Sequence, residues 1–120
     1  MDKPEQSKNG AVPVVDLRAL EETLEVEGAK EIAAGFLEDV ASVPDRLKNS
    51  VQDKNAELLR HASHMLKGCC RIIMATATAE LAGKMEVIAT EKRWSDAEQL
   101  LPQLLDSFGT TVDYLQAYLE

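Results

Sequence analysis

Aromatic side chains make up only 4% of the 120 residues, whereas apolar residues as a whole make up 45%. That apolar fraction suffices for one folded domain with its own core. Because the apolar residues are mostly Ala, Leu, Val, Ile and Met, the composition favours helices over sheets. No alternating run of Val, Ile and Thr indicates a strand. We therefore expect a single all-α domain.

Basic residues are also scarce, with 13 Lys and Arg against 21 Asp and Glu, which gives a formal net charge of −8. Such a chain repels phosphate backbones and anionic lipid, so nucleic acid and membrane surfaces are poor candidates for partners. No apolar run approaches the ~20 residues of a membrane span, and the start, MDKPEQSKNG, has no apolar stretch typical of a secretory signal. The only two cysteines, Cys69 and Cys70, are adjacent and fit a reducing cytoplasm.

The chain divides into a polar start and one periodic region. Residues 1–13 contain Pro4, Gly10 and Pro13 and lack periodicity, so we interpret them as a disordered tail or a linker. Helical spacing of apolar residues then continues almost without interruption over residues 14–120. We expect this region to be the folded domain.

The first two helices are expected on either side of Gly28. Asp16 can cap a short helix, and a longer helix carries apolar residues at steps of three and four up to Val51. Pro44 should kink that helix, but the apolar face keeps its phase across Pro44. One bent helix is therefore expected instead of two.

Three more helices complete the pattern. One spans residues 55–74, a turn is expected within residues 75–78, and the next helix ends near Trp94. Ser95 and Glu98 form a capping box for the last helix, which Pro102 should bend or delay. The apolar seam predicted for the helix over 55–74 is Leu58, Ala62, Met65, Cys69 and Ile72. Together these elements predict an antiparallel four-helix bundle with a short additional N-terminal helix.

Two histidines in the segment RHASHMLKGCC differ in their expected direction. At about 100° per residue, His64 lies roughly 140° and Lys67 about 160° from the centre of the predicted seam, so both should face water. Arg60 and Arg71 lie within about 20 to 40° of the His64 direction. His61 lies roughly 80° from the seam centre, where a histidine commonly packs at the edge of the core.

The surroundings of His64 indicate a chemical role. Gly68, one turn later, costs roughly 1 kcal/mol relative to alanine in a helix, but its missing side chain opens the approach to the imidazole. Arg60, Lys67 and Arg71 disfavour imidazolium and could screen a phosphoryl group on the ring. An exposed, neutral histidine with free access and nearby cations suggests a phosphoryl acceptor.

The residues from His64 to Gly68 read H-x-L-K-G, which resembles the signature of histidine-containing phosphotransfer (HPt) domains of two-component phosphorelays. The order of the helices resembles that family over roughly residues 14–120. The resemblance implies that His64 is phosphorylated, that Leu66 points inward, and that Lys67 and Gly68 support the site. This chain differs from the family at two places. The family's helix commonly ends in a Gly-Ala pair, where this chain has Met74-Ala75, and the family usually has small residues after the glycine, where this chain has Cys69 and Cys70.

The resemblance also implies a covalent phosphocarrier that exchanges phosphate reversibly with the aspartyl phosphate of receiver domains. The receiver would supply Mg²⁺, and this chain would bind no cofactor. No G-x-x-x-x-G-K-[ST] loop and no kinase glycine-rich loop occurs, so we expect neither ATP binding nor kinase activity. The expected partners are response-regulator or hybrid-kinase receivers, and the expected oligomeric state is a monomer.

Three alternatives remain open. The bundle could be an interaction module whose histidine is never phosphorylated. A metal could bind His61, His64 and the cysteines, although Cys69 is expected to face the seam and Cys70 the far flank. Phosphate could instead reside on His61, which is expected to be half-buried and lacks a lysine three residues later.

Overall fold

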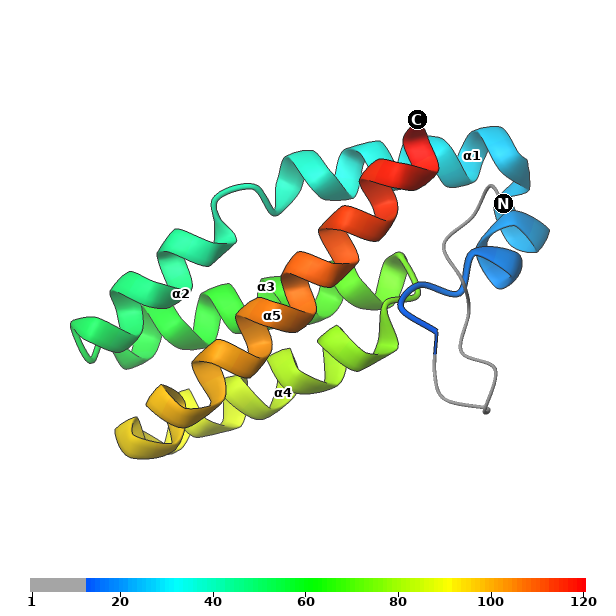
Figure 1. Cartoon of the computed structure of the whole chain (residues 1–120). Helices are drawn as coiled ribbons and strands as arrows, with labels where there is room; N and C mark the ends of the chain where they lie inside the picture. The colour runs from blue at the N-terminus through cyan, green and yellow to red at the C-terminus, as the bar shows by residue number, and fades with distance from the viewer. Residues whose placement is uncertain (1–12) are drawn as a thin grey trace.

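The structure, a computed structural model, describes residues 13–120, which contain five helices and no strand (Figure 1). The helices are α1 (Leu17–Asp39), α2 (Val43–Gln52), α3 (Ala56–Ile72), α4 (Thr76–Glu91) and α5 (Trp94–Leu119). Helix α2 continues the direction of α1, and α3, α4 and α5 then alternate in direction (Figure 1). The predicted all-α, antiparallel four-helix bundle is confirmed. Residues 1–12 of the predicted tail lie outside the described residues.

Helix α1 is broken at Glu25 and not at Gly28 as the sequence predicted. Glu25 has φ 63° and ψ 173°, a conformation outside the helical region, so the short N-terminal helix ends one turn earlier than expected. Gly28 is helical, and a Cβ there would lie 3.1 Å from the Leu24 Cβ. The glycine therefore allows close packing beside the break instead of forming it. Asp16 caps the helix as expected, accepting a hydrogen bond from the Ala19 amide at 3.1 Å.

Tyr118 near the end of α5 holds both parts of α1. Its hydroxyl donates to the Glu21 carboxylate at 2.7 Å, before the break, and the Lys30 ammonium lies 5.7 Å from its ring centroid, after the break. Partial burial and the Glu21 carboxylate raise the pKa of Tyr118 to about 12. These contacts hold α1 against the C-terminal end of α5.

The single bent helix predicted across Pro44 is wrong. Helix α1 ends at Asp39, three residues leave the helical path, and α2 begins at Val43 with Pro44 in its first turn. Proline fits that position because its missing N–H would have no partner within the helix. Val40 and Val43 stay fully buried across the turn, so the apolar face kept its phase although the backbone did not stay helical.

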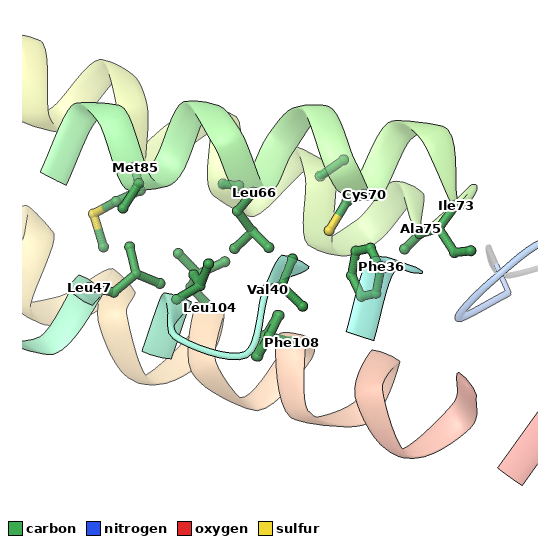
Figure 2. Close-up of a cluster of buried hydrophobic side chains, with 14 of the residues drawn as sticks. Phe36, Val40, Leu47, Leu66, Cys70, Ile73, Ala75, Met85, Leu104 and Phe108 are labelled. Carbon is green, nitrogen blue, oxygen red and sulfur yellow. The ribbon is translucent and has the colours of Figure 1, made fainter. Parts of the chain in front are cut away.

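The buried stripe of α3 is displaced by about one residue from the predicted seam. Ile72 is 63% exposed, Cys69 is half-buried, and Cys70 is fully buried, which reverses the predicted directions of the two cysteines. Figure 2 shows the Cys70 thiol directed toward the ring of Phe36 in the core. The buried stripe consists of Leu59, Ala62, Leu66, Cys70 and Ile73. Both stripes have helical spacing, so spacing alone could not choose between them.

Helices α2, α3 and α4 end in the same way, with a non-glycine residue in the left-handed conformation. Lys54, Met74 and Lys92 have φ of 52°, 67° and 56°. After Met74, the Ala75 amide donates to the Cys70 carbonyl at 2.8 Å, which closes the end of α3 as glycine-ended helices usually close. The turn after α3 therefore forms although Met74 stands at the position where HPt domains commonly have glycine.

The predicted boundaries of the last two helices are shifted. Helix α4 begins at Thr76 and ends at Glu91, so most of the predicted turn over 75–78 is helical. Helix α5 begins at Trp94 without a side-chain cap, and the predicted Ser95 capping box is wrong because the left-handed Lys92 turns the chain earlier. Pro102 lies inside α5 and does not delay its start.

Buried hydroxyl groups join α4 to α5. The Thr78 Oγ1 lies 2.6 Å from the Ser107 Oγ and 2.9 Å from the Thr111 Oγ1, and all three groups satisfy one another's hydrogen bonds. Pairing these groups avoids the cost of burying a lone hydroxyl, which favours one register between the two helices. Over residues 13–120, no helix is both long and apolar enough to cross a membrane.

Candidate phosphoryl-acceptor site

Helix α3 presents His64 to solvent near its middle. The helix begins after Asn55, whose side chain accepts a hydrogen bond from the Leu58 amide at 3.0 Å. Leu66 on the opposite side is fully buried, and the His64 side chain is 63% exposed. The inward direction expected for Leu66 and the outward direction expected for His64 therefore both occur.

Glu86 on α4 contacts His64 directly. Its Oε2 lies 2.8 Å from the His64 Nδ1. Because an ionised carboxylate can only accept a hydrogen bond, Nδ1 must carry the proton. In the neutral imidazole the lone pair is then on Nε2, which is the ring nitrogen left free for an incoming electrophile. The contact thus selects both the tautomer and the orientation of the ring.

The same carboxylate binds Lys67. The Lys67 Nζ lies 2.7 Å from the Glu86 Oε1, and only about a fifth of either side chain is exposed, at 21% and 19%. Partial burial by itself would raise the pKa of Glu86, but the hydrogen bonds and charges of Lys67 and His64 outweigh it and lower the pKa. Glu86 is therefore ionised at neutral pH. Lys67 does not face water as the sequence predicted, because the carboxylate draws it against α4.

Two glycines leave space around this pair. A Cβ at Gly68 would meet no atom within 4 Å, which supports the open approach to His64 expected from the sequence. Gly83 lies one turn before Glu86 on α4, and a Cβ there would be 3.4 Å from the Lys67 Cδ. The missing side chain at Gly83 gives the lysine stem room to reach the carboxylate.

The two arginines predicted to support His64 are less closely involved. Arg60 lines a hollow between α3 and α4 with Thr90 and Lys92 among its neighbours. Arg71 lines another hollow near the turn from α3 to α4. Within residues 13–120 neither arginine forms an ion pair, and neither contacts the Glu86 carboxylate. Arg60 and Arg71 can therefore act on His64 only through the long-range attraction or repulsion of their charges.

His61 is exposed and not half-buried as the sequence predicted. Its Nδ1 lies 3.5 Å from a guanidinium nitrogen of Arg46 on α2, and no carboxylate of residues 13–120 holds it. The prediction for His61 was wrong because the buried stripe of α3 is rotated away from His61 relative to the predicted seam. Among residues 13–120, no three His, Cys, Asp or Glu side chains come together as a possible metal site.

Glu86 is the partner of His64 and Lys67 that sequence reasoning missed. It follows the buried Met85 by one position, which places it at the edge of the core stripe of α4. Its partners are 19 and 22 residues earlier, so only the register of α4 against α3 brings them together. The spacing of Gly83 and Glu86 by three residues is the only local signal, and it is too general to be recognised alone.

A bundle of this kind, with an exposed histidine on its central helix, belongs to the phosphotransfer class of signalling proteins. The profile of the Hpt domain matches residues 31–118, and the chain is a member of this family. Hpt domains are phosphotransfer intermediates in two-component signalling and are phosphocarriers, not kinases.

A solved structure shares the fold. Histidine-containing phosphotransfer protein B (HptB) from Pseudomonas aeruginosa PAO1 superposes with a TM-score of 0.77 and 24% sequence identity. The match covers 88% of this chain and 94% of that one. A comparison with curated proteins gave no match.

Proposed function

We propose that His64 accepts a phosphoryl group from the aspartyl phosphate of a receiver domain and passes it on to another receiver. The observation that carries the proposal is the Nδ1–Glu86 contact at 2.8 Å on a histidine that is 63% exposed. It leaves a nucleophilic Nε2 facing solvent, next to the open side of Gly68. Within residues 13–120, His61 has no such carboxylate partner, which favours His64 of the two histidines.

The transfer requires little from this chain beyond the correct position of the His64 ring. The Nε2 lone pair attacks phosphorus in line, an N–P bond forms as the acyl P–O bond breaks, and the aspartate carboxylate leaves with the bonding electrons. The proton stays on Nδ1, so the phosphorylated ring is positively charged, and the Glu86 carboxylate stabilises that charge. Because Nδ1 keeps its proton, the ring leaves as neutral imidazole when the N–P bond breaks in the return reaction, which fits a reversible carrier.

Lys67 has a second role in this scheme. Its ammonium is already within 2.7 Å of Glu86 and one turn from His64, so it can turn to an oxygen of the phosphoryl group once the ring is occupied. The receiver would hold the Mg²⁺, and this chain would need no cofactor of its own. We expect a monomer in the cytoplasm that depends on its partners for phosphate.

Labelling with a phosphorylated receiver and Mg²⁺ tests the assignment. We expect a label that is stable to base, labile to acid, lost in His64→Gln and retained in His61→Gln. A label that survives in His64→Gln and disappears in His61→Gln would move the site to His61. Absence of label with every receiver tried, in a protein that still binds receivers, would favour the interaction module that never carries phosphate.

A further inference from the structure

The residues before the break in α1 form an arm that folds over the end of the bundle. We call residues 14–24 the arm. Three of its apolar side chains are at most 2% exposed, namely Val15, Leu17 and Leu20. The Asp16 amide donates a hydrogen bond to the Met74 carbonyl at 3.1 Å, which ties the arm to the turn between α3 and α4. Figure 1 shows the arm in blue beside that turn. The arm is therefore part of the core.

The break between the arm and the rest of α1 depends on one strained residue. Glu25 has φ 63° and ψ 173°, which lies in a region that is almost exclusive to glycine. Leu24 and Val26 on either side are helical, and they are 37% and 50% exposed. Leu and Glu are good helix formers, and neither glycine nor proline occurs at the break. The local sequence therefore favours a continuous helix over the broken one.

The arm and the rest of α1 carry apolar stripes on opposite sides of the helix. The stripe of the arm consists of Leu17, Leu20 and Leu24, and the later stripe consists of Ala29, Ala33 and Phe36. On a continuous helix at about 100° per residue, the two stripes would point roughly 150° apart. A straight α1 could therefore not cover one bundle with both stripes. The break at Glu25 brings both stripes to the same core.

We propose that two copies of this chain exchange their arms. In the exchanged dimer Glu25 is helical, α1 runs straight, and the stripe of the arm faces the second copy. The arm then occupies the place that the second copy's own arm has left, which is domain swapping across a strained hinge. The closed chain is the monomer expected from the sequence, and the dimer forms from it. This inference goes beyond the proposed function and does not depend on it.

The exchange keeps the contacts of the arm and adds two gains. The hydrogen bond between Glu21 and Tyr118, at 2.7 Å in the closed chain, forms between the copies. Two strained Glu25 residues relax into the helical region, and Leu24 is covered by the second copy. Association costs translational freedom, so the dimer should form at high protein concentration. Opening the arm exposes its buried side chains, so the exchange should be slow and the two forms separable.

Substitutions at Glu25 test the role of the strained hinge. After incubation of the full chain at high concentration, analytical ultracentrifugation should detect a dimer beside the monomer. Glu25→Gly should raise the Kd of this dimer by at least about a hundredfold, because glycine tolerates the closed conformation, disfavours the straight helix, and acts twice in each dimer. Glu25→Ala removes the same charge but keeps the strain, so its Kd should equal the wild-type value or fall below it.

Glu38→Gly is the matched control for the glycine substitution. Glu38 is exposed and helical near the other end of α1, so glycine there removes the same charge and weakens the same helix in both forms. Its Kd should stay within about threefold of the wild-type value. Absence of a dimer at every concentration, or a dimer of Glu25→Gly as tight as that of the wild-type chain, would overturn the proposal.

A disulfide shows which copy each arm covers. The backbone contact between residues 16 and 74 brings Asp16→Cys and Met74→Cys within reach of each other, and Cys69→Ala removes the neighbouring thiol. Oxidation of the isolated dimer should join two chains on a denaturing gel, whereas oxidation of the monomer should close the link within one chain. A dimer whose links all close within single chains associates through another surface and would overturn the exchange. If these cysteines prevent folding, the substitutions at Glu25 still decide the proposal.

The exchange and the proposed function can fail separately. Met74 lies ten residues after His64, or about 15 Å along the axis of α3, so the arm stays away from the ring. Phosphoramidate, a small phosphoryl donor, should label His64 at the same rate in the monomer and in the dimer. If phosphoramidate and receivers label neither form, the proposed function fails, while ultracentrifugation still decides the exchange of arms.

Discussion

Replacing Glu86 by glutamine should affect both folding and phosphoryl acceptance. The substitution keeps the shape of the side chain but removes its charge, and the amide oxygen can accept from only one of the two partners well. The contact with Lys67 is the less exposed of the two, with 21% and 19% of the side chains accessible, whereas His64 is 63% exposed. We therefore attribute most of the lost stability to Lys67, and expect a decrease of about 1–2 kcal/mol in the free energy of unfolding at pH 7.

The pH dependence of this loss follows from the lowered pKa of Glu86. A carboxyl with a depressed pKa in the folded state stabilises the protein above its ordinary pKa of about 4.3, and the stabilisation disappears as pH falls through the lower folded value. The difference between wild type and Glu86→Gln should therefore be present at pH 7 and should decrease as pH falls through the lowered pKa of Glu86, so that it is smaller at pH 3 than at pH 7. Urea denaturation followed by circular dichroism at both pH values measures it.

Phosphoryl acceptance should fall with the same substitution. Without the carboxylate, Nδ1 loses the acceptor that selects the tautomer and stabilises the charged product, and a loss of 1.4 kcal/mol in the transition state corresponds to a tenfold slower reaction. We expect phosphoramidate to label Glu86→Gln about tenfold more slowly than wild type. Glu80→Gln, an exposed glutamate on the same helix, is the control and should change neither property. Equal labelling rates, or a stability loss that is the same at pH 3 and pH 7, would refute this account of Glu86.

The remaining predictions concern the rest of the bundle. Glu25→Gly should raise the free energy of unfolding by about 1 kcal/mol, because φ 63° with ψ 173° is a conformation that costs non-glycine residues roughly 1–3 kcal/mol, and a lower melting temperature would contradict it. Lys54→Gly should stabilise by about 0.5–1 kcal/mol for its φ of 52° in an exposed helix end, as urea denaturation can measure. Iodoacetamide at pH 8 should modify Cys69 slowly and leave Cys70, whose pKa burial raises to about 12, unmodified in the native state. Asp39→Asn should speed modification of Cys69, because the carboxylate helps to raise the pKa of that thiol, and mass spectrometry of the peptide follows the rates.

The sequence predicted most of the fold because the apolar spacing is strong and the connections are short. It failed where two local solutions fit the same pattern. Pro44 permits a kinked helix or a helix start, and the buried Val40 and Val43 fit both. Met65 and Ile72 have the spacing of a seam, but so do Leu66 and Ile73, and only packing against the other helices selects the second pair.

The site was predicted in part for a related reason. His64 lies nearly opposite both candidate seams, so an error of one residue in the seam did not change its exposure, whereas it moved His61 from the edge of the core to the surface. Glu86 depends on the register between α3 and α4, and nothing in the sequence of α3 indicates which residue of α4 lies beside His64. Local periodicity predicts whether a side chain is exposed more readily than it identifies that side chain's partner on another helix.

Substitutions on the α4 side of His64 and on its α1 side should affect the rate of phosphoryl acceptance differently. On the α4 side, Glu86 contacts the His64 ring and Lys67 contacts Glu86, so changes there should alter the rate of the proposed transfer with every donor, large or small. On the α1 side, Gly35 and Ile72 line a hollow between α1 and α3 whose lining includes neither His64 nor Glu86, so changes there should alter the rate only with donors large enough to cover that hollow. A carrier that serves several receivers can then change its partners through α1 while the chemistry of His64 stays the same. Comparison of phosphoramidate, a small donor, with receivers across variants on both sides would contradict this separation if variants at Gly35 or Ile72 slowed labelling by phosphoramidate as well.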